Sequence, residues 1–122
     1  MDRWRFVRTN RDADAREALA ALDLPLFAIW GTEDLNVDAG ADAEIYRALA
    51  APRHPMSRVV LWPEATHGLL RAGPYNWQLV EDWSPWAHAR FVVQGRHAYA
   101  PGAMEAITDW ITAVAAEAGA AP

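Results

Sequence analysis

The chain has 122 residues, of which 52% are hydrophobic and seven are tryptophan, and its formal net charge is -5. This length and apolar content suit a single folded domain and exclude disorder for most of the chain. An acidic chain with scattered basic residues predicts neither nucleic acid nor an anionic membrane surface as partner, because both attract basic patches. Cysteine is absent, which excludes disulfides and thiolate chemistry.

The amino terminus, MDRWR, lacks the apolar core of a signal peptide. No apolar run approaches the length that spans a membrane. We therefore expect a soluble, cytoplasmic protein.

A helix and a strand are predicted in the first thirty residues. Asn10 is a good N-cap for a helix over 11–22, where apolar residues recur at helical spacing. Pro25 ends that pattern. The continuous apolar run over 24–30 predicts a strand buried on both faces, as in a parallel sheet.

A second helix and a second strand follow the acidic loop over 32–37. Asp38 can cap a helix that continues to Leu49, before two prolines. The contiguous apolar residues within 58–62 predict a strand, which Pro63 closes.

The segment 69–100 has no strong periodicity, and we expect a long irregular excursion with a possible short strand over 90–93. Loops of this length often carry function. Pro101 then opens a helix over 102–118. The expected apolar face of this helix consists of Met104, Ile107, Ile111 and Val114.

A carboxylate and an imidazole each follow one of the two predicted strands. Asp34 ends the motif IWGTED, and His67 lies in LWPEATHG. In a Ser-His-Asp triad the imidazole takes the serine proton, while the carboxylate fixes its tautomer and stabilises the imidazolium. The sequence holds no Gly-x-Ser-x-Gly elbow, so this acid and base have no evident nucleophile.

The order of helix, strand, helix, strand, long loop and helix is typical of a doubly wound α/β sheet. Within that order, LPLFAIWGTEDLNV resembles the penultimate strand and acid loop of the α/β-hydrolase fold. RVVLWPEATHGLL resembles the final strand and histidine loop, and the segment from Pro101 resembles the closing helix. The resemblance implies an α/β class and a single domain over 1–122: a partial α/β-hydrolase fold, with its last two parallel strands and flanking helices.

That resemblance implies a serine hydrolase of the esterase, lipase or peptidase kind, acting on an ester, thioester or amide. Asp34 would be the triad acid and His67 the base, in the family's order of nucleophile, acid and histidine. The nucleophile elbow and oxyanion hole would have to precede Met1, so we expect the chain alone to be inactive. The expected partner is a nucleophile-bearing amino-terminal half, or a second copy; the alternative is a non-catalytic remnant or interaction module that associates through an exposed sheet edge.

Plainer roles compete for each acidic and histidine candidate. Asp34 could be a turn or cap carboxylate. Glu33 and Asp38 could in principle take its place as the acid, but Glu33 is better explained as a solvated loop charge and Asp38 as the helix cap. His67 could be a loop histidine satisfied by backbone groups.

The other histidines and the two serines are weaker candidates. We expect His54 to be exposed in a proline-rich turn. His88 and His97 lie in the segment 69–100, which leaves a metal or proton-shuttle role open. Histidine pairs at i,i+4 and the H-E-x-x-H motif are both missing from the sequence, so no metal site and no cofactor are predicted.

Ser84 has neither flanking glycines nor a strand-to-helix turn, and Ser57 precedes the second strand at the end opposite the catalytic loops. Neither is expected to be a nucleophile. The aromatic cluster Trp77, Trp83 and Trp86 is interpreted as a satellite core under the long loop, with a substrate or cap surface as the alternative.

Overall fold

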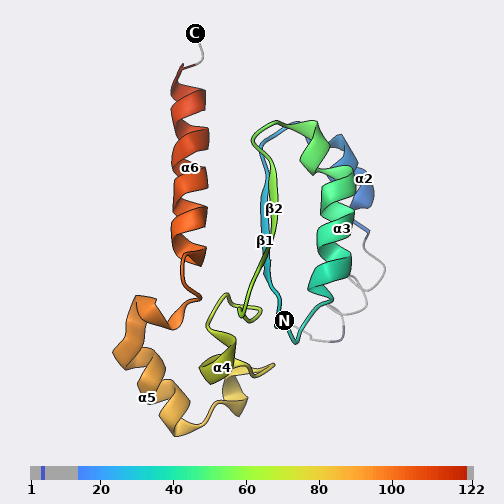
Figure 1. Ribbon diagram of the computed structural model, residues 1–122. Helices are drawn as coiled ribbons and strands as arrows, with labels where there is room; N and C mark the ends of the chain where they lie inside the picture. The colour runs from blue at the N-terminus through green and yellow to red at the C-terminus, as the bar shows by residue number, and fades with distance from the viewer. Residues whose placement is uncertain (1–3, 5–13, 121–122) are drawn as a thin grey trace.

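A computed structural model describes Trp4 and residues 14–120 of the chain (Figure 1). The elements follow one another as α2 (Arg16–Ala21), β1 (Phe27–Gly31), α3 (Ala39–Leu49), the 3-10 helix η1 (Ala51–Arg53), β2 (Arg58–Trp62), α4 (Ala72–Tyr75), η2 (Val80–Asp82), α5 (Pro85–Gln94), η3 (Gly95–Ala98) and α6 (Ala103–Ala120).

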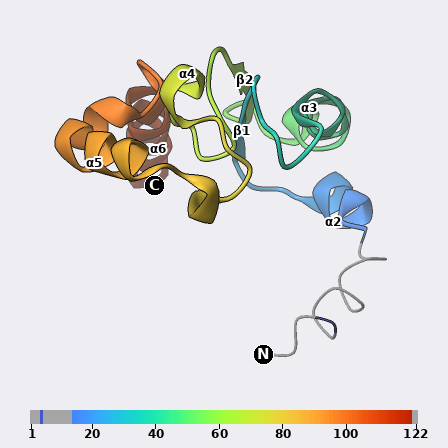
Figure 2. The same ribbon diagram turned by 90° about the horizontal axis from the view of Figure 1, so that it is seen from below.

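The strands β1 and β2 pair in parallel, in a register that runs from Phe27 opposite Arg58 to Gly31 opposite Trp62. Parallel neighbours need a crossover connection, and α3 supplies it. Because successive strand side chains point to opposite faces, the Phe27 ring contacts Trp110 of α6 and the Trp30 ring contacts Tyr46 of α3, at centroid distances of 5.4 and 5.0 Å. Figures 1 and 2 show α3 and α6 on opposite sides of the sheet, which confirms the predicted α/β class.

The second helix and second strand match their predictions closely. Asp38 caps α3 as expected, because its Oδ1 accepts a hydrogen bond from the Ala41 amide at 2.9 Å. The strand β2 has the predicted bounds.

The described part of the first predicted helix is shorter than 11–22, and the first strand begins later than predicted. The helix α2 covers only part of 11–22; Asn10 and the residues up to 13 lie outside the described residues. The strand β1 starts at Phe27 instead of Leu24, which is 65% exposed. Pro25 explains the late start, since it has no amide hydrogen to contribute to a sheet.

The apolar face of α6 differs from the prediction by one position. Ile111 is 54% exposed, and Trp110 takes its place against the sheet. The Trp110 Nε1–H also donates a hydrogen bond of 2.7 Å to the Met56 carbonyl. The larger ring, which also carries a hydrogen-bond donor, therefore sets the rotation of the helix.

The segment 69–100 is largely helical, so the expectation of an irregular excursion is corrected. The predicted strand over 90–93 is wrong, because these residues belong to α5. The helix has a capping signal at its start: the Ser84 Oγ accepts from the Ala87 amide at 3.2 Å, and Pro85 occupies the first turn.

The same segment closes on itself beside the histidine loop. Leu70 and Tyr99 form an antiparallel bridge, and the Ala100 amide donates to the Leu69 carbonyl at 2.8 Å. In Figure 1, α4 and α5 lie below the sheet, where the strands end. The segment therefore covers the end of the sheet at which Asp34 and His67 are found.

The core of the described residues is small. Most of its buried apolar residues are alanines, and Tyr75 is the largest side chain that is fully buried. The strand β1 was expected to be buried on both faces, but only Ala28 and Gly31 are buried in it. Each strand also has one edge without a strand partner among the described residues. None of the described helices combines the length and apolarity needed to cross a membrane.

Candidate functional site

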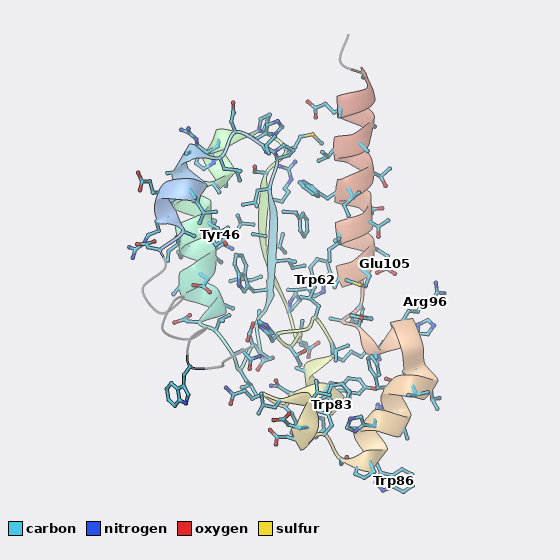
Figure 3. The ribbon with its side chains drawn as sticks, turned by 180° about the vertical axis from the view of Figure 1, so that it is seen from behind. Tyr46, Trp62, Trp83, Trp86, Arg96 and Glu105 are labelled. Atoms are coloured by element: carbon cyan, nitrogen blue, oxygen red, sulfur yellow. The ribbon has the colours of Figure 1, made fainter. Side chains whose placement is uncertain are left out.

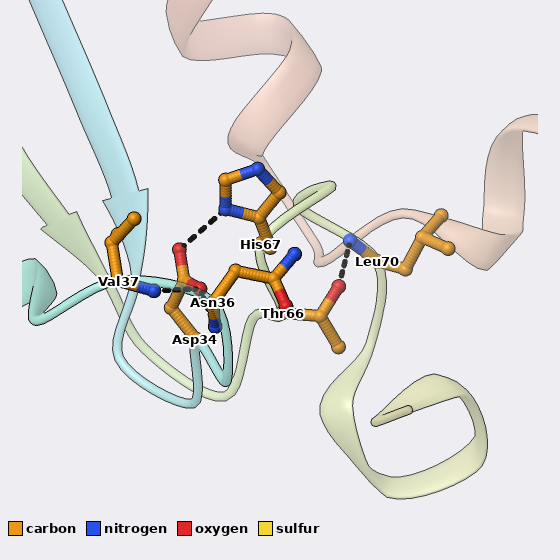
Figure 4. Close-up of polar contacts among 6 residues, drawn as sticks. All are labelled: Asp34, Asn36, Val37, Thr66, His67 and Leu70. Atoms are coloured by element: carbon orange, nitrogen blue, oxygen red, sulfur yellow. Dashed lines mark hydrogen bonds and ion pairs between the residues drawn. The ribbon is translucent and has the colours of Figure 1, made fainter. Parts of the chain in front are cut away.

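Asp34 and His67, which are 33 residues apart in the sequence, meet beyond the carboxyl ends of the two strands (Figure 4). The His67 Nδ1 lies 2.8 Å from the Asp34 Oδ2. The carboxyl ends of parallel strands fall at the same sheet edge, so the loops that follow β1 and β2 are neighbours. The structure therefore brings together the two residues that the sequence singled out.

Hydrogen bonds join the two loops directly. The Thr32 amide donates to the Trp62 carbonyl and the Glu33 amide to the Ala65 carbonyl, both at 2.9 Å. The Glu64 amide donates to the Thr32 Oγ1 at 3.0 Å. These bonds extend the β1–β2 pairing into the loops and fix the spacing between Asp34 and His67.

Gly31 allows this close approach. A Cβ at this position would collide with the backbone carbonyl groups of Ala65 and Thr66. Backbone atoms cannot rotate out of the way as a flexible side chain can, so a larger residue would push the histidine loop off the acid loop.

The Asp34 carboxylate is held by several hydrogen bonds. Its Oδ1 accepts from the Asn36 amide at 2.7 Å and the Val37 amide at 3.2 Å, which leaves Oδ2 for His67. The side chain is only 1% exposed. Burial acts to raise the pKa of Asp34, but the hydrogen bonds from Asn36, His67 and Val37 outweigh it, and the net effect lowers the pKa. The group is therefore an ionised acceptor at neutral pH.

His67 is open to solvent on its other side. Its side chain is 57% exposed, although its partner carboxylate is buried. An ionised carboxylate only accepts hydrogen bonds, so the Nδ1 of His67 carries the hydrogen and donates it to Asp34. In the neutral imidazole this leaves Nε2 unprotonated, and Figure 4 shows that nitrogen on the ring edge away from Asp34. Such a nitrogen can accept a proton.

The histidine loop contains two residues with left-handed backbone, Glu64 at φ 53° and Leu69 at φ 58°. This conformation costs a residue other than glycine roughly 1 kcal/mol or more. Backbone hydrogen bonds hold both residues in this conformation. The Glu64 carbonyl accepts from the Ala72 amide and the Leu69 carbonyl accepts from the Ala100 amide, each at 2.8 Å. The segment 69–100 thus fixes the shape of the loop that presents His67.

Both serines have structural contacts. Ser57 is buried at the amino end of β2, where its Oγ accepts from the Leu26 amide at 3.2 Å. Ser84 caps α5.

The remaining histidines lie apart from Asp34. His54 was expected to be exposed but is half-buried, and its Nδ1 accepts from the Met56 amide at 3.2 Å. The His88 Nδ1 lies 3.1 Å from the Ser84 carbonyl, and His97 is exposed in η3. Within the described part of the chain, histidine, aspartate and glutamate residues do not gather in threes as a metal ion would require.

Two of the three tryptophans in the predicted aromatic cluster lie together in the structure. The rings of Trp77 and Trp83 lie 6.3 Å apart, whereas Trp86 is 85% exposed and points away from the molecule (Figure 3). A cavity of about 180 Å³ separates the cluster from His67. Three of its lining residues, Leu35, Leu70 and Val80, were not singled out from the sequence, because an isolated apolar residue in a loop carries no periodic signal.

Comparisons of the chain with protein-family models, with curated proteins and with solved structures found no match. The site consists of a buried, ionised carboxylate that orients an exposed imidazole, beside a small cavity.

Proposed function

We propose that Asp34 and His67 are the acid and the general base of a hydrolase site that acts on an ester, thioester or amide. The observation that carries the proposal is the 2.8 Å contact from the His67 Nδ1 to a carboxylate oxygen that is otherwise buried. The arrangement has the orientation of a triad acid and base: carboxylate to Nδ1, with Nε2 free. Its placement beyond two adjacent parallel strands supports the resemblance to the carboxyl-terminal part of an α/β-hydrolase fold.

In this proposal the Nε2 of His67 takes the proton of a serine hydroxyl while the serine oxygen bonds to the substrate carbonyl carbon. The imidazolium is stabilised by Asp34. It then returns the proton to the leaving alcohol, thiol or amine as that group departs. Water, deprotonated by the same Nε2, releases the acyl group and regenerates the serine.

The nucleophile and the oxyanion hole are assigned to another polypeptide segment. Ser57 and Ser84 are engaged in structural hydrogen bonds, and neither contacts His67 in the described structure. Both strands are half-buried, and each has one edge that pairs with no other strand in the described part of the chain; such edges are suited to adding further strands. A segment that carries the nucleophile elbow would extend this sheet.

The proposal is tested by recovering the chain from its native host and treating the recovered material with a tagged fluorophosphonate. Mass spectrometry should find the probe on a serine of a partner polypeptide. Labelling should fall at least about a hundredfold when the chain carries His67→Ala. The matched control, His97→Ala, changes an exposed histidine outside the site and should leave labelling unchanged.

The purified chain alone should hydrolyse p-nitrophenyl acetate no faster than buffer. Turnover by the chain alone, lost on His67→Ala and blocked by the fluorophosphonate, would mean that it holds its own nucleophile. Labelling of the recovered material that is indifferent to His67 would contradict the catalytic role.

A second candidate function, an interaction module without catalysis, is favoured by the two strand edges that have no partner strand among residues 14–120. Exposed edges with half-buried apolar faces are a template for pairing with another chain. This candidate predicts that the chain recovers a partner just as well when it carries His67→Ala, and that the recovered complex binds no fluorophosphonate.

A further inference from the structure

A cavity of about 180 Å³ opens directly beside His67. The acid loop forms one wall, through Leu35, and the segment after the histidine forms the others, through Leu70, Trp77, Val80 and Trp83. A group bound in this cavity would therefore lie next to the imidazole.

The lining of this cavity is apolar and aromatic. Apart from His67, its lining residues include no lysine, arginine, aspartate or glutamate. The other polar side chains of the lining, which include those of Asn36, Thr66, Asn76 and Gln78, are neutral. Small-molecule sites have this composition, with mostly apolar walls and a few polar groups that orient the ligand. Apart from His67, the lining offers a charged group no partner of opposite charge to offset its lost hydration.

Further aromatic contacts and one hydrogen bond support the tryptophan that forms an aromatic wall of the cavity. The Trp83 ring packs against Tyr75 and Phe91 at centroid distances of 5.4 and 5.5 Å. The buried Tyr75 hydroxyl donates to the Gln94 Oε1 at 2.8 Å, which ties α4 to α5. Figure 3 shows Trp83 turned inward and Trp86 turned outward, so the two tryptophans have different environments.

The volume limits what can enter. A cavity of about 150 Å³ lined by apolar side chains binds benzene in a well-studied engineered protein. The present cavity, at about 180 Å³, accommodates one aromatic ring or a short branched alkyl group. A longer acyl chain would have to extend past the mouth, where Leu35 and Val80 are 53% and 64% exposed.

We propose that this cavity receives an uncharged aromatic or short alkyl group of the molecule on which Asp34 and His67 act. The inference rests on the proposed function for its link to catalysis, and it narrows the substrate class to compounds that carry a small apolar substituent near the reacting group. Binding itself requires no nucleophile, so it can be measured on the chain alone.

The test is a fluorine NMR titration of the purified chain with 4-fluoroacetophenone, a neutral ketone with one aromatic ring. We expect saturable line broadening, and at least tenfold weaker binding of the anion 4-fluorobenzoate. Val80→Glu places a charge at the cavity mouth and should weaken binding of the ketone at least tenfold. Val92→Glu is the matched control, because Val92 is 79% exposed on α5 and does not line the cavity.

If Val80→Glu does not fold by circular dichroism, Trp77→Ala is compared with Trp86→Ala. The first change should weaken binding of the ketone and the second should not. Unsaturable binding, equal binding of the anion, or binding that is unaffected in the cavity variant that folds would each overturn the assignment.

The variant Asp34→Asn separates this inference from the proposed function, because Asp34 does not line the cavity. Binding that persists in this variant, together with fluorophosphonate labelling that does not depend on His67, leaves the cavity as a binding site and removes the catalytic role. Labelling that depends on His67, with no binding of the ketone, keeps the catalytic role and removes the cavity as a binding site.

Discussion

Two regions hold His67 in place, and they do so by different means. On one side, the loops after β1 and β2 are joined by backbone hydrogen bonds that continue the pairing of the strands. On the other side, the segment 69–100 supports the histidine loop through the Leu70–Tyr99 bridge and an aromatic cluster around Trp83. The first region depends on close backbone contact and the second on side-chain packing, so different substitutions should disrupt them.

The largest effect is expected from Gly31→Ala. The added Cβ would collide with the backbone carbonyls of Ala65 and Thr66, and we expect the free energy of unfolding to fall by more than about 3 kcal/mol. Urea denaturation followed by circular dichroism measures it. The matched control is Gly40→Ala within α3, where the nearest atom, the Asp38 Oδ1, is 3.5 Å from the new Cβ; it should stabilise the chain by about 0.5 kcal/mol. Equal stability of the two variants would show that the acid loop and the histidine loop do not depend on the close approach of Gly31 to the backbone of Ala65 and Thr66.

Trp83→Ala should have the next largest effect. It removes the ring that contacts Tyr75, Trp77, His88 and Phe91, and we expect a loss of about 3 kcal/mol. The loss is read from the urea midpoint and slope. Trp86→Ala, at a residue that is 85% exposed, should change stability by less than about 0.5 kcal/mol. A similar loss from both changes would mean that the cluster does not support the segment.

Asp34→Asn should have the smallest effect on stability, about 1.5 kcal/mol at neutral pH, because it weakens a charge-assisted hydrogen bond without leaving a cavity. Asp38→Asn is the control, since asparagine caps a helix as well as aspartate does.

The effect of Asp34→Asn should also depend on pH. The pKa of Asp34 is lowered in the folded chain, so its carboxylate stays ionised at a pH where the unfolded chain binds a proton. The stabilisation that the Asp34 carboxylate contributes to the folded chain is therefore complete above about pH 4. It is lost as the pH falls through the lowered pKa that Asp34 has in the folded chain. Urea titrations from pH 7 to pH 2.5 should show that the difference in free energy of unfolding between the original chain and Asp34→Asn becomes smaller below about pH 4. A gap that widens in acid would contradict the lowered pKa.

The features that could be predicted from the sequence are those with a local signal. The apolar run within 58–62 and the cap at Asp38 identified β2 and the start of α3, because strand burial and helix capping depend on nearby residues. The helix α5 was missed although Ser84 and Pro85 are a recognisable start, because its contiguous apolar residues Phe91 to Val93 resemble a strand. The rotation of α6 was also missed, since it depends on a contact between Trp110 and Phe27, which are far apart in the sequence.

Local sequence patterns were enough to single out one carboxylate and one imidazole, because Asp34 and His67 each follow a predicted apolar strand. Their 2.8 Å contact and the mostly apolar cavity beside them follow from contacts between segments that are far apart in the sequence. Parallel pairing places two strand ends side by side, and Gly31 lets the loops approach. The cavity, in contrast, is formed by side chains from the acid loop and from the segment 69–100, which no local pattern relates to each other.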